Sequence, residues 1–195
     1  MTFYFQLFIF ELIAYFLGSI PFGLVVSKLV KHIDLRNYGS GNIGATNAVR
    51  VLNKKWGALV LFLDGMKAVV AILLVKYFVC SCPKILALTA CVAVLGHIFP
   101  IWLKFKGGKG FACILFSLLF LDYRIGLAIL LTWILVFLLS RISSLSALCS
   151  IIVGLIVSFF VSKVYFVMVI FLVIITFCRH IANIRRLIKG EESKF

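Results

Sequence analysis

Residues 56–75 read WGALVLFLDGMKAVVAILLV, a run of 20 residues whose charged side chains are Asp64 and Lys67. About 20 apolar residues form a helix long enough to cross the hydrocarbon core of a bilayer. The whole chain has 195 residues, and 64% of them are hydrophobic, whereas soluble proteins average about half. Comparable apolar runs occupy residues 3–30, 85–103, 111–140 and 145–178. The sequence therefore predicts an all-α polytopic membrane protein in which residues 1–195 form a single integral-membrane domain.

Two of these runs contain a helix-breaking proline or charged residues. The first holds Glu11 and the segment 18–23, where Pro21 removes a backbone donor, so we expect a kinked helix there. Glu11 is costly in lipid and is expected to face the helix bundle or the interface. Asp64 and Lys67 are three positions apart and share one helix face, where they can pair. Such a pair can be purely structural or can line a polar site.

Each of the two long apolar blocks has a polar interruption near its middle. Residues 122–124 read Asp-Tyr-Arg, and residues 162–163 read Ser-Lys. If each block were one long span, these charges would lie near the bilayer centre, where they are expensive. We therefore predict that each block folds as a hairpin of two shorter spans. This gives seven transmembrane helices, and the alternative of one span per block gives five.

The distribution of basic residues predicts which side of the membrane each loop faces. With seven spans, 15 of the 20 Lys and Arg lie in the first, third and fifth loops and the C-terminal tail, and four lie in the opposite loops. The positive-inside rule then places the N-terminus outside and the C-terminus in the cytoplasm. The loop of residues 31–55, the loop of residues 104–110 and the tail are cytoplasmic with five spans as well. We expect the function on this face.

The polar segment of residues 38–50 reads YGSGNIGATNAVR and differs from everything around it. Glycines let backbone N–H groups approach an oxyanion, and an arginine offers a fork for phosphate. The spacing G-x-G-x-x-G also fits a dinucleotide fingerprint, but no strand precedes it, and Ala45 stands where a phosphate-binding P-loop needs lysine. We predict an anion site formed by Ser40, Gly41, Asn42, Gly44, Thr46, Asn47 and Arg50.

Two further polar segments are expected on the same face. Gly107, Gly108 and Gly110 surround Lys109, so the backbone can approach a ligand beside a point charge. In the tail, His180 and Asn183 are three positions apart and can share a helix face.

Several other functions are disfavoured by the residues. A net charge of +14 would suggest nucleic acid in a soluble chain, but here the basic residues lie between apolar runs and fit topology or an anionic ligand, so we predict no nucleic-acid partner. The six cysteines lie in or beside apolar runs without a C-x-x-C pair, which favours inert thiols over a zinc site. The sequence has no carboxylate cluster for magnesium and no nucleophile elbow. We predict no metal and no other cofactor.

In their order and spacing, the motifs of this chain resemble the bacterial acyl-phosphate–glycerol-3-phosphate acyltransferases (the PlsY family). The resemblance covers essentially the whole chain. It rests on residues 18–23, 39–47, 105–110, His180, Asn183-Ile184, Arg186-Leu187, Gly190 and Glu192. One departure is Glu191, where a small polar residue is commoner in the family.

The resemblance implies an enzyme that moves a fatty acyl group from acyl phosphate to the 1-hydroxyl of sn-glycerol 3-phosphate, which is the first step of bacterial phospholipid synthesis. The products are 1-acyl-sn-glycerol 3-phosphate (lysophosphatidic acid) and phosphate. It implies a multi-pass protein of the bacterial inner membrane with a cytoplasmic active site, and we expect a monomer in the lipid bilayer.

By the same resemblance, Ser40 and Arg50 are the essential pair of the first motif, and Gly107–Gly110 with Lys109 is the glycerol-phosphate loop. The resemblance also makes His180 and Asn183 site residues, and Thr46 and Ser144 neighbours of the acyl-phosphate head. Glu192 is expected to maintain the structure. Ser40, Arg50, Lys109, His180 and Asn183 are the expected catalytic residues.

An acyl phosphate is already activated, so positioning and charge neutralisation can supply much of the rate. Either His180 or an oxygen of the acyl phosphate can take the proton, and we favour the substrate oxygen because no acid lies near His180 in the sequence to orient its ring.

A transporter or flippase for a phosphorylated metabolite or lipid is the alternative. It predicts polar groups through the bilayer midplane and two related halves. Here the polar segments gather at one face, and the sequence shows no convincing internal repeat.

Overall fold

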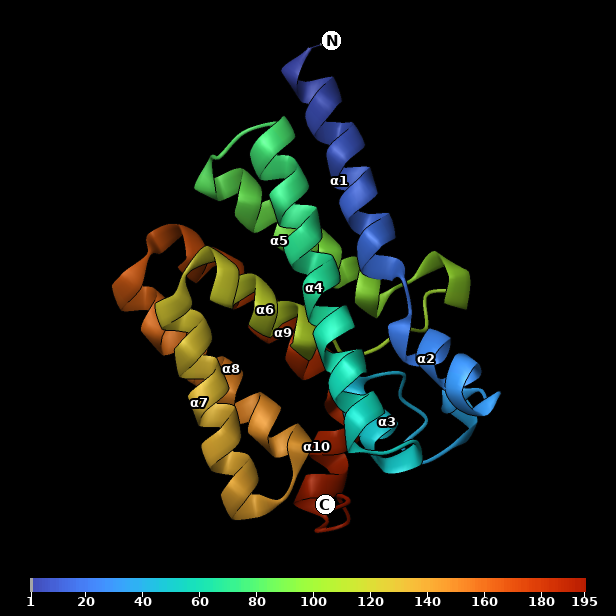
Figure 1. Cartoon of the computed structure of the whole chain (residues 1–195). Coiled ribbons are helices and arrows are strands. Elements are labelled where there is room, and N and C mark those ends of the chain that lie inside the picture. The colour runs from blue at the N-terminus through green and yellow to red at the C-terminus, as the bar shows by residue number, and fades with distance from the viewer. Residues whose placement is uncertain (1) are drawn as a thin grey trace. The chain divides into compact units, whose positions relative to one another are not determined.

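The computed structural model describes residues 2–195, and their regular structure is helical, which confirms the predicted all-α class (Figure 1). In chain order the elements are α1 Phe3–Ser19, α2 Phe22–Lys31, the 3-10 helix η1 Leu35–Asn37, α3 Ala45–Val51, α4 Lys54–Phe78, α5 Pro83–Ile98, the 3-10 helix η2 Ile101–Leu103, α6 Phe111–Leu121, α7 Tyr123–Ser140, α8 Ser143–Val161, α9 Lys163–Arg179 and α10 Ile181–Ile188. The chain forms two compact units, one up to Ser117 and one from Leu118 onward, and candidate site residues occur in both.

Among residues 2–195, five helical segments are long and apolar enough to cross a membrane, and α9 with α10 makes a sixth if this pair, bent by 63°, is one span. Helix boundaries lie at both predicted interruptions, because α6 ends before Asp122 and α8 ends before Ser162. The predicted seven transmembrane helices are therefore not reached by length and apolar composition alone. The remaining apolar helix, α6, has only 11 residues, which rise about 17 Å against a hydrocarbon core of about 30 Å.

The predicted kink in the first span is a complete break between α1 and α2. Helix α1 ends at Ser19, the chain is extended at Ile20, and α2 begins after Pro21. Glycines on both sides of the break allow close packing. A Cβ atom on Gly18 would overlap the Ala93 backbone of α5, and one on Gly23 would overlap the carbonyl of Ile43. The break therefore lies directly against the polar segment of residues 38–50.

The expectation that residues 31–55 form an open loop was wrong in one respect. This segment contains the 3-10 helix η1 and the seven-residue helix α3. Beneath them lies a small apolar core of Leu24, Val26, Leu35, Ile43, Ala48, Leu52 and Val60. Apolar residues of this segment therefore pack into a core while its polar residues stay outside it. The segment is polar on average, so its composition did not predict this packing.

In the second unit, α8 packs closely against α7 and α9. Its buried face carries a small residue at every fourth position, namely Ser146, Ser150, Gly154 and Ser158. The three serine hydroxyls donate to carbonyls of their own helix, so none of them is left without a partner. Small residues let membrane helices approach closely, and here Gly154 lies against Ile129 of α7.

Candidate functional site

The side chain of Asn47 organises the polar segment of residues 38–50. Its Oδ1 accepts the backbone N–H of Ser40 at 2.9 Å, and its Nδ2 donates to the carbonyls of Leu35, Tyr38 and Asn42 at 3.2, 3.0 and 2.9 Å. Asn47 is 1% exposed. The sequence predicted Asn47 as a donor to the ligand, whereas its amide is engaged with the loop itself. The residue therefore shapes the loop that presents Ser40.

Glycine is required at two positions of this loop by its backbone. Gly39 and Gly41 have φ values of +60° and +70°, in the left-handed region that residues with a Cβ rarely adopt. A Cβ on Gly39 would also overlap the Asn47 amide. These glycines wrap the chain around the Asn47 side chain.

The sequence suggested that glycine N–H groups point at an anion, but four of these groups donate hydrogen bonds within the protein. The N–H of Gly41 donates to the Tyr38 carbonyl, and that of Gly44 donates to the side chain of Asn42. In the second glycine-rich segment, the N–H groups of Gly107 and Gly108 donate to the carbonyls of Ile98 and His97. These contacts fix the backbone, so side chains are left as the main candidates for ligand contacts.

The first unit holds three of the five expected catalytic residues on short segments. Ser40 is exposed, and Arg50 is half-buried near the end of α3, on which Thr46 also lies. Lys109 is half-buried and lies two positions before α6, between the buried Gly108 and Gly110. Gly110 has a φ of +85°, so glycine is favoured where the chain turns into the helix.

The other arginine of this region is neutralised locally. Arg36 donates to both carboxylate oxygens of Asp34, with the shortest contact at 2.6 Å. Hydrogen bonds from Arg36 lower the pKa of Asp34 to about 2, so the pair keeps its charges at neutral pH. Arg36 was not among the predicted site residues, and its pairing with Asp34 agrees with a local structural role.

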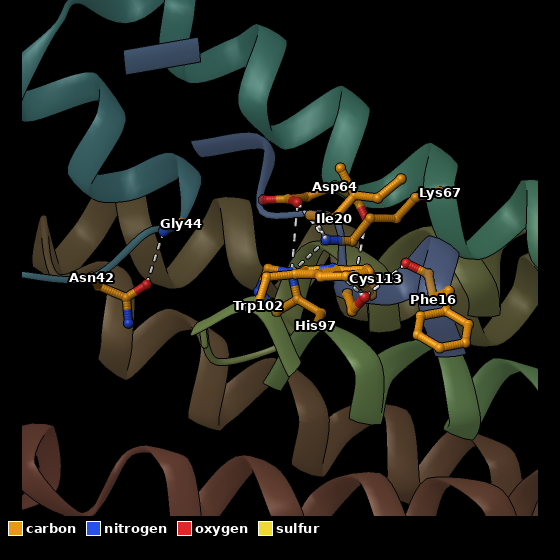
Figure 2. A network of polar contacts seen from close by, with 10 residues as sticks. Phe16, Ile20, Asn42, Gly44, Asp64, Lys67, His97, Trp102 and Cys113 are labelled. Carbon is orange, nitrogen blue, oxygen red and sulfur yellow. Dashed lines mark hydrogen bonds and ion pairs between the residues drawn. The ribbon is translucent and has the colours of Figure 1, made fainter. Parts of the chain in front are cut away.

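A buried charged cluster lies between the two polar segments of the first unit (Figure 2). Lys67 Nζ lies 2.7 Å from Asp64 Oδ1 and 2.9 Å from His97 Nδ1, and it donates to the Ile20 carbonyl at 2.7 Å. All three side chains of this Asp64–Lys67–His97 cluster are at most 5% exposed. The sequence predicted the Asp64–Lys67 pair, which is confirmed, but missed His97. The signal was present, because His97 stands at the end of an apolar run just before the glycine-rich segment.

The tail folds back around one carboxylate in the second unit. Glu192 accepts hydrogen bonds from Ser144 Oγ at 2.7 Å, from Asn183 Nδ2 at 2.5 Å and from Arg186 Nε at 2.6 Å. Burial raises the pKa of Glu192, but these three hydrogen bonds outweigh it and hold the pKa below its ordinary value. The expected structural role of Glu192 thus has a physical basis, and its neighbour Glu191 is exposed.

His180 lies at the corner between α9 and α10 and is 2% exposed. Its Nδ1 is 2.8 Å from the carbonyl of Thr176. A carbonyl only accepts, so the proton is on Nδ1 and the lone pair is on Nε2. Asn183, one turn later, is also buried. The sequence predicted that both residues can share a helix face; in the structure His180 is the residue before α10 and Asn183 lies within it. The sequence could not foresee the backbone carbonyl that orients the ring.

Comparisons with known proteins agree over nearly the whole chain. Residues 8–190 match a family model described as "Glycerol-3-phosphate acyltransferase". A glycerol-3-phosphate acyltransferase of Wolbachia pipientis subsp. Culex pipiens is 43% identical over 184 residues, which cover 94% of this chain and 96% of the relative. The corresponding protein of Caulobacter vibrioides is 45% identical over 182 residues, which cover 92% of this chain and 84% of the relative.

Two solved structures are similar in fold as well. The crystal structure of PlsY, an integral membrane glycerol 3-phosphate acyltransferase, in its glycerol 3-phosphate form has a TM-score of 0.90 and 39% identity, and it covers 97% of this chain and 95% of that one. Its lysophosphatidic acid form has a TM-score of 0.88 and 38% identity over the same shares.

Proposed function

Because this chain belongs to the glycerol-3-phosphate acyltransferase family, we propose that it transfers a fatty acyl group from acyl phosphate to the 1-hydroxyl of sn-glycerol 3-phosphate. The chain is a membrane acyltransferase enzyme. The observation that carries the proposal is the likeness, at a TM-score of 0.90, to a protein solved in a glycerol 3-phosphate form. The products are 1-acyl-sn-glycerol 3-phosphate and inorganic phosphate.

The reaction needs no covalent enzyme intermediate. The hydroxyl oxygen attacks the acyl carbonyl carbon, the bond from that carbon to the phosphate oxygen breaks, and phosphate leaves with the electron pair. Two anionic substrates must be held against their mutual repulsion, and fixed cations lower that cost. We assign this role to Arg50 and Lys109, with Ser40 and Thr46 as hydroxyl donors and Gly107–Gly110 as the loop that receives the glycerol phosphate.

The hydroxyl proton has two possible acceptors in this scheme. His180 is oriented by the Thr176 carbonyl through Nδ1, and no acid lies near it in the sequence to act as the orienting carboxylate of a general base. We therefore keep the acyl-phosphate oxygen as the favoured base and assign His180, with Asn183, to substrate positioning. Ser144, whose hydroxyl is held by Glu192, is assigned to the region of the acyl-phosphate head.

We also propose the finer topology. The short helix α6 counts as a seventh crossing at which the bilayer thins locally to match about 17 Å. The N-terminus is outside, and residues 31–55, residues 104–110 and the tail face the cytoplasm. The excess of Lys and Arg in those segments supports this orientation. The protein then acts as a single-domain monomer in a bacterial inner membrane.

Purified protein in detergent tests the activity. We expect phosphate release and lysophosphatidic acid formation with an acyl phosphate and glycerol 3-phosphate, and no product when acyl-CoA replaces the acyl phosphate. Product from acyl-CoA alone would overturn the proposed donor, and absence of product from either donor would overturn the function.

Two variants decide between the bases. Lys109→Ala is expected to lose at least 100-fold in kcat/KM, because a positioned charge at the reacting phosphates is worth roughly 3 kcal/mol. His180→Gln is expected to keep kcat within about tenfold if the substrate oxygen is the base, since general-base loss costs roughly 100-fold or more. A kcat for His180→Gln as low as that for Lys109→Ala would instead assign the base to His180.

A further inference from the structure

The ammonium group of Lys67 is surrounded by three acceptors. It has three hydrogens, and its three partners are Asp64 Oδ1, the Ile20 carbonyl and His97 Nδ1. A lysine ammonium only donates, so towards Lys67 the Nδ1 of His97 is an acceptor and the ring proton is on Nε2. The same Nδ1 lies 3.5 Å from Asp64 Oδ1, so the ring faces both charged partners. The lysine therefore fixes both the tautomer and the rotation of the imidazole ring.

The opposite edge of the same ring supports the glycine-rich segment that carries Lys109. A Cβ on Gly108 would overlap His97 Nε2, so the glycine lies directly on the imidazole edge. The N–H of Gly108 also donates to the His97 carbonyl at 3.1 Å, and that of Gly107 to the Ile98 carbonyl at 3.0 Å. The turn before Lys109 is thus held by the side chain and the backbone at the end of α5.

The same cluster also contacts the break between α1 and α2 and the helix α6. Lys67 reaches the Ile20 carbonyl, which is available because Pro21 ends α1 there, and the Cys113 thiol of α6 donates to the Asp64 carbonyl at 2.9 Å. Buried charges with unsatisfied partners are costly, and Lys67 has three partners for its three hydrogens, so this ammonium group favours the observed arrangement. Figure 2 shows Asp64 and Lys67 of α4, His97 of α5 and Cys113 of α6 gathered beside Ile20 at the α1–α2 break.

We propose that the buried Asp64–Lys67–His97 cluster is a positioning network that sets the place of Lys109 for its anionic substrate, through the contact of His97 with Gly108. None of the three side chains is a catalytic residue in this account. They act only through the backbone at Gly107 and Gly108. The proposal rests on the assignment of Lys109 to glycerol 3-phosphate binding.

Kinetics with both substrates varied separately test this network. Asp64→Asn/Lys67→Met removes both charges together, so that neither is left buried without a partner. We expect a 10- to 100-fold fall in kcat/KM for glycerol 3-phosphate, as for a small misplacement of a binding group, with the KM for acyl phosphate changed less than threefold. Lys84→Met, at an exposed lysine of α5, is the matched control and should change neither.

A second pair of variants tests the role of the ring itself. His97→Gln retains an acceptor for Lys67 and an amide against Gly108, whereas His97→Leu has similar bulk but no polar atom. We expect His97→Leu to reproduce the selective loss for glycerol 3-phosphate and His97→Gln to restore most of it, with melting temperatures of the two variants within a few degrees.

The outcomes separate this proposal from a purely structural role. If the glycerol 3-phosphate KM stays within twofold in the folded double variant, the network does not position Lys109. If both substrate KM values and the melting temperature change together, or if none of these variants folds, the cluster serves folding alone and the proposal is overturned. If the unaltered enzyme itself makes no product, the proposed function fails instead, before any variant is compared.

Discussion

At the scale of single residues, Asn47 deals with a problem common to polar loops on membrane proteins. The loop must keep a defined shape, although it has few regular backbone-to-backbone hydrogen bonds of its own. One buried carboxamide satisfies three carbonyls and one N–H from residues 35–42, and it leaves Ser40 exposed at the surface. Replacing Asn47 therefore removes all four of these hydrogen bonds at once.

Asn47→Ala is therefore expected to destabilise the protein by about 1–3 kcal/mol, the cost of leaving a buried hydrogen-bonding group without a partner. Activity should fall more than stability, because Ser40 loses its fixed position. Asn47→Asp should be at least as harmful, since it brings a negative charge to three carbonyl oxygens. Melting temperature and kcat/KM measure the two effects. Asn37→Ala, at an exposed asparagine of η1, is the matched control, and an equal loss there would contradict this account.

The sequence predicted contacts between residues that are close along one helix, but it did not predict contacts between distant segments. The pairing of Asp64 with Lys67 follows from helix spacing alone and is confirmed. The partners of Asn47 and the place of His97 depend on contacts between segments up to 30 positions apart. Spacing along a chain cannot predict such contacts, because they are set by how helices pack.

At the scale of helices, the corner between α9 and α10 is held by a carboxylate from the tail. Glu192 joins Ser144 at the start of α8 to Asn183 and Arg186 of α10. The folded-state pKa of Glu192 is below its ordinary value, so the ionised form is the one that the fold stabilises. The resulting contribution to stability is complete above pH 4.5 and is lost as the pH falls through the lower folded pKa.

Glu192→Gln should accordingly lower the free energy of unfolding at pH 7 by about 1.5–3 kcal/mol, the worth of hydrogen bonds to a charged group. For a chain of this size, that corresponds to roughly 3–12 °C in melting temperature. The difference between the unaltered protein and the variant should shrink as the pH is lowered below 4.5. Glu191→Gln, at the exposed neighbour, should show no such difference, and a gap that widens in acid would refute the account.

Helix boundaries were predictable where the sequence carries a strong local signal. Pro21 ends α1, and the polar interruptions at residues 122–124 and 162–163 separate α6 from α7 and α8 from α9. Helix α3 was not foreseen, because seven residues give too little periodicity for a prediction. The length of α6 was also missed, since the uniform apolar block after Gly110 does not mark where a helix begins or ends.

At the scale of the whole molecule, basic residues are concentrated in alternate connections between apolar helices. This asymmetry predicts sidedness without any knowledge of packing, because it arises during membrane insertion. The family and the membrane class were predictable for a related reason. Both depend on the order and composition of segments, whereas the geometry of the site depends on how side chains pack in space.

Thiol labelling tests the proposed orientation. Cys82, in the connection between α4 and α5, is exposed and free, and it should react with a membrane-impermeant maleimide on intact cells. A cysteine introduced as Lys54→Cys in a Cys80→Ser/Cys82→Ser background should react only after permeabilisation. Cys82→Ser supplies the background signal. The reverse pattern would invert the topology and would move the polar segments to the outer face.

The internal hydrogen bonds of the two glycine-rich segments bear on the thermodynamics of ligand binding. The N–H groups of Gly41, Gly44, Gly107 and Gly108 have partners within the protein, at Tyr38, Asn42, Ile98 and His97. The entropy of ordering these segments is therefore lost during folding, and binding need not supply it. Calorimetry of glycerol 3-phosphate binding should consequently show a small heat-capacity change. Either substrate should also be able to bind first, because neither has to build the loop that receives the other.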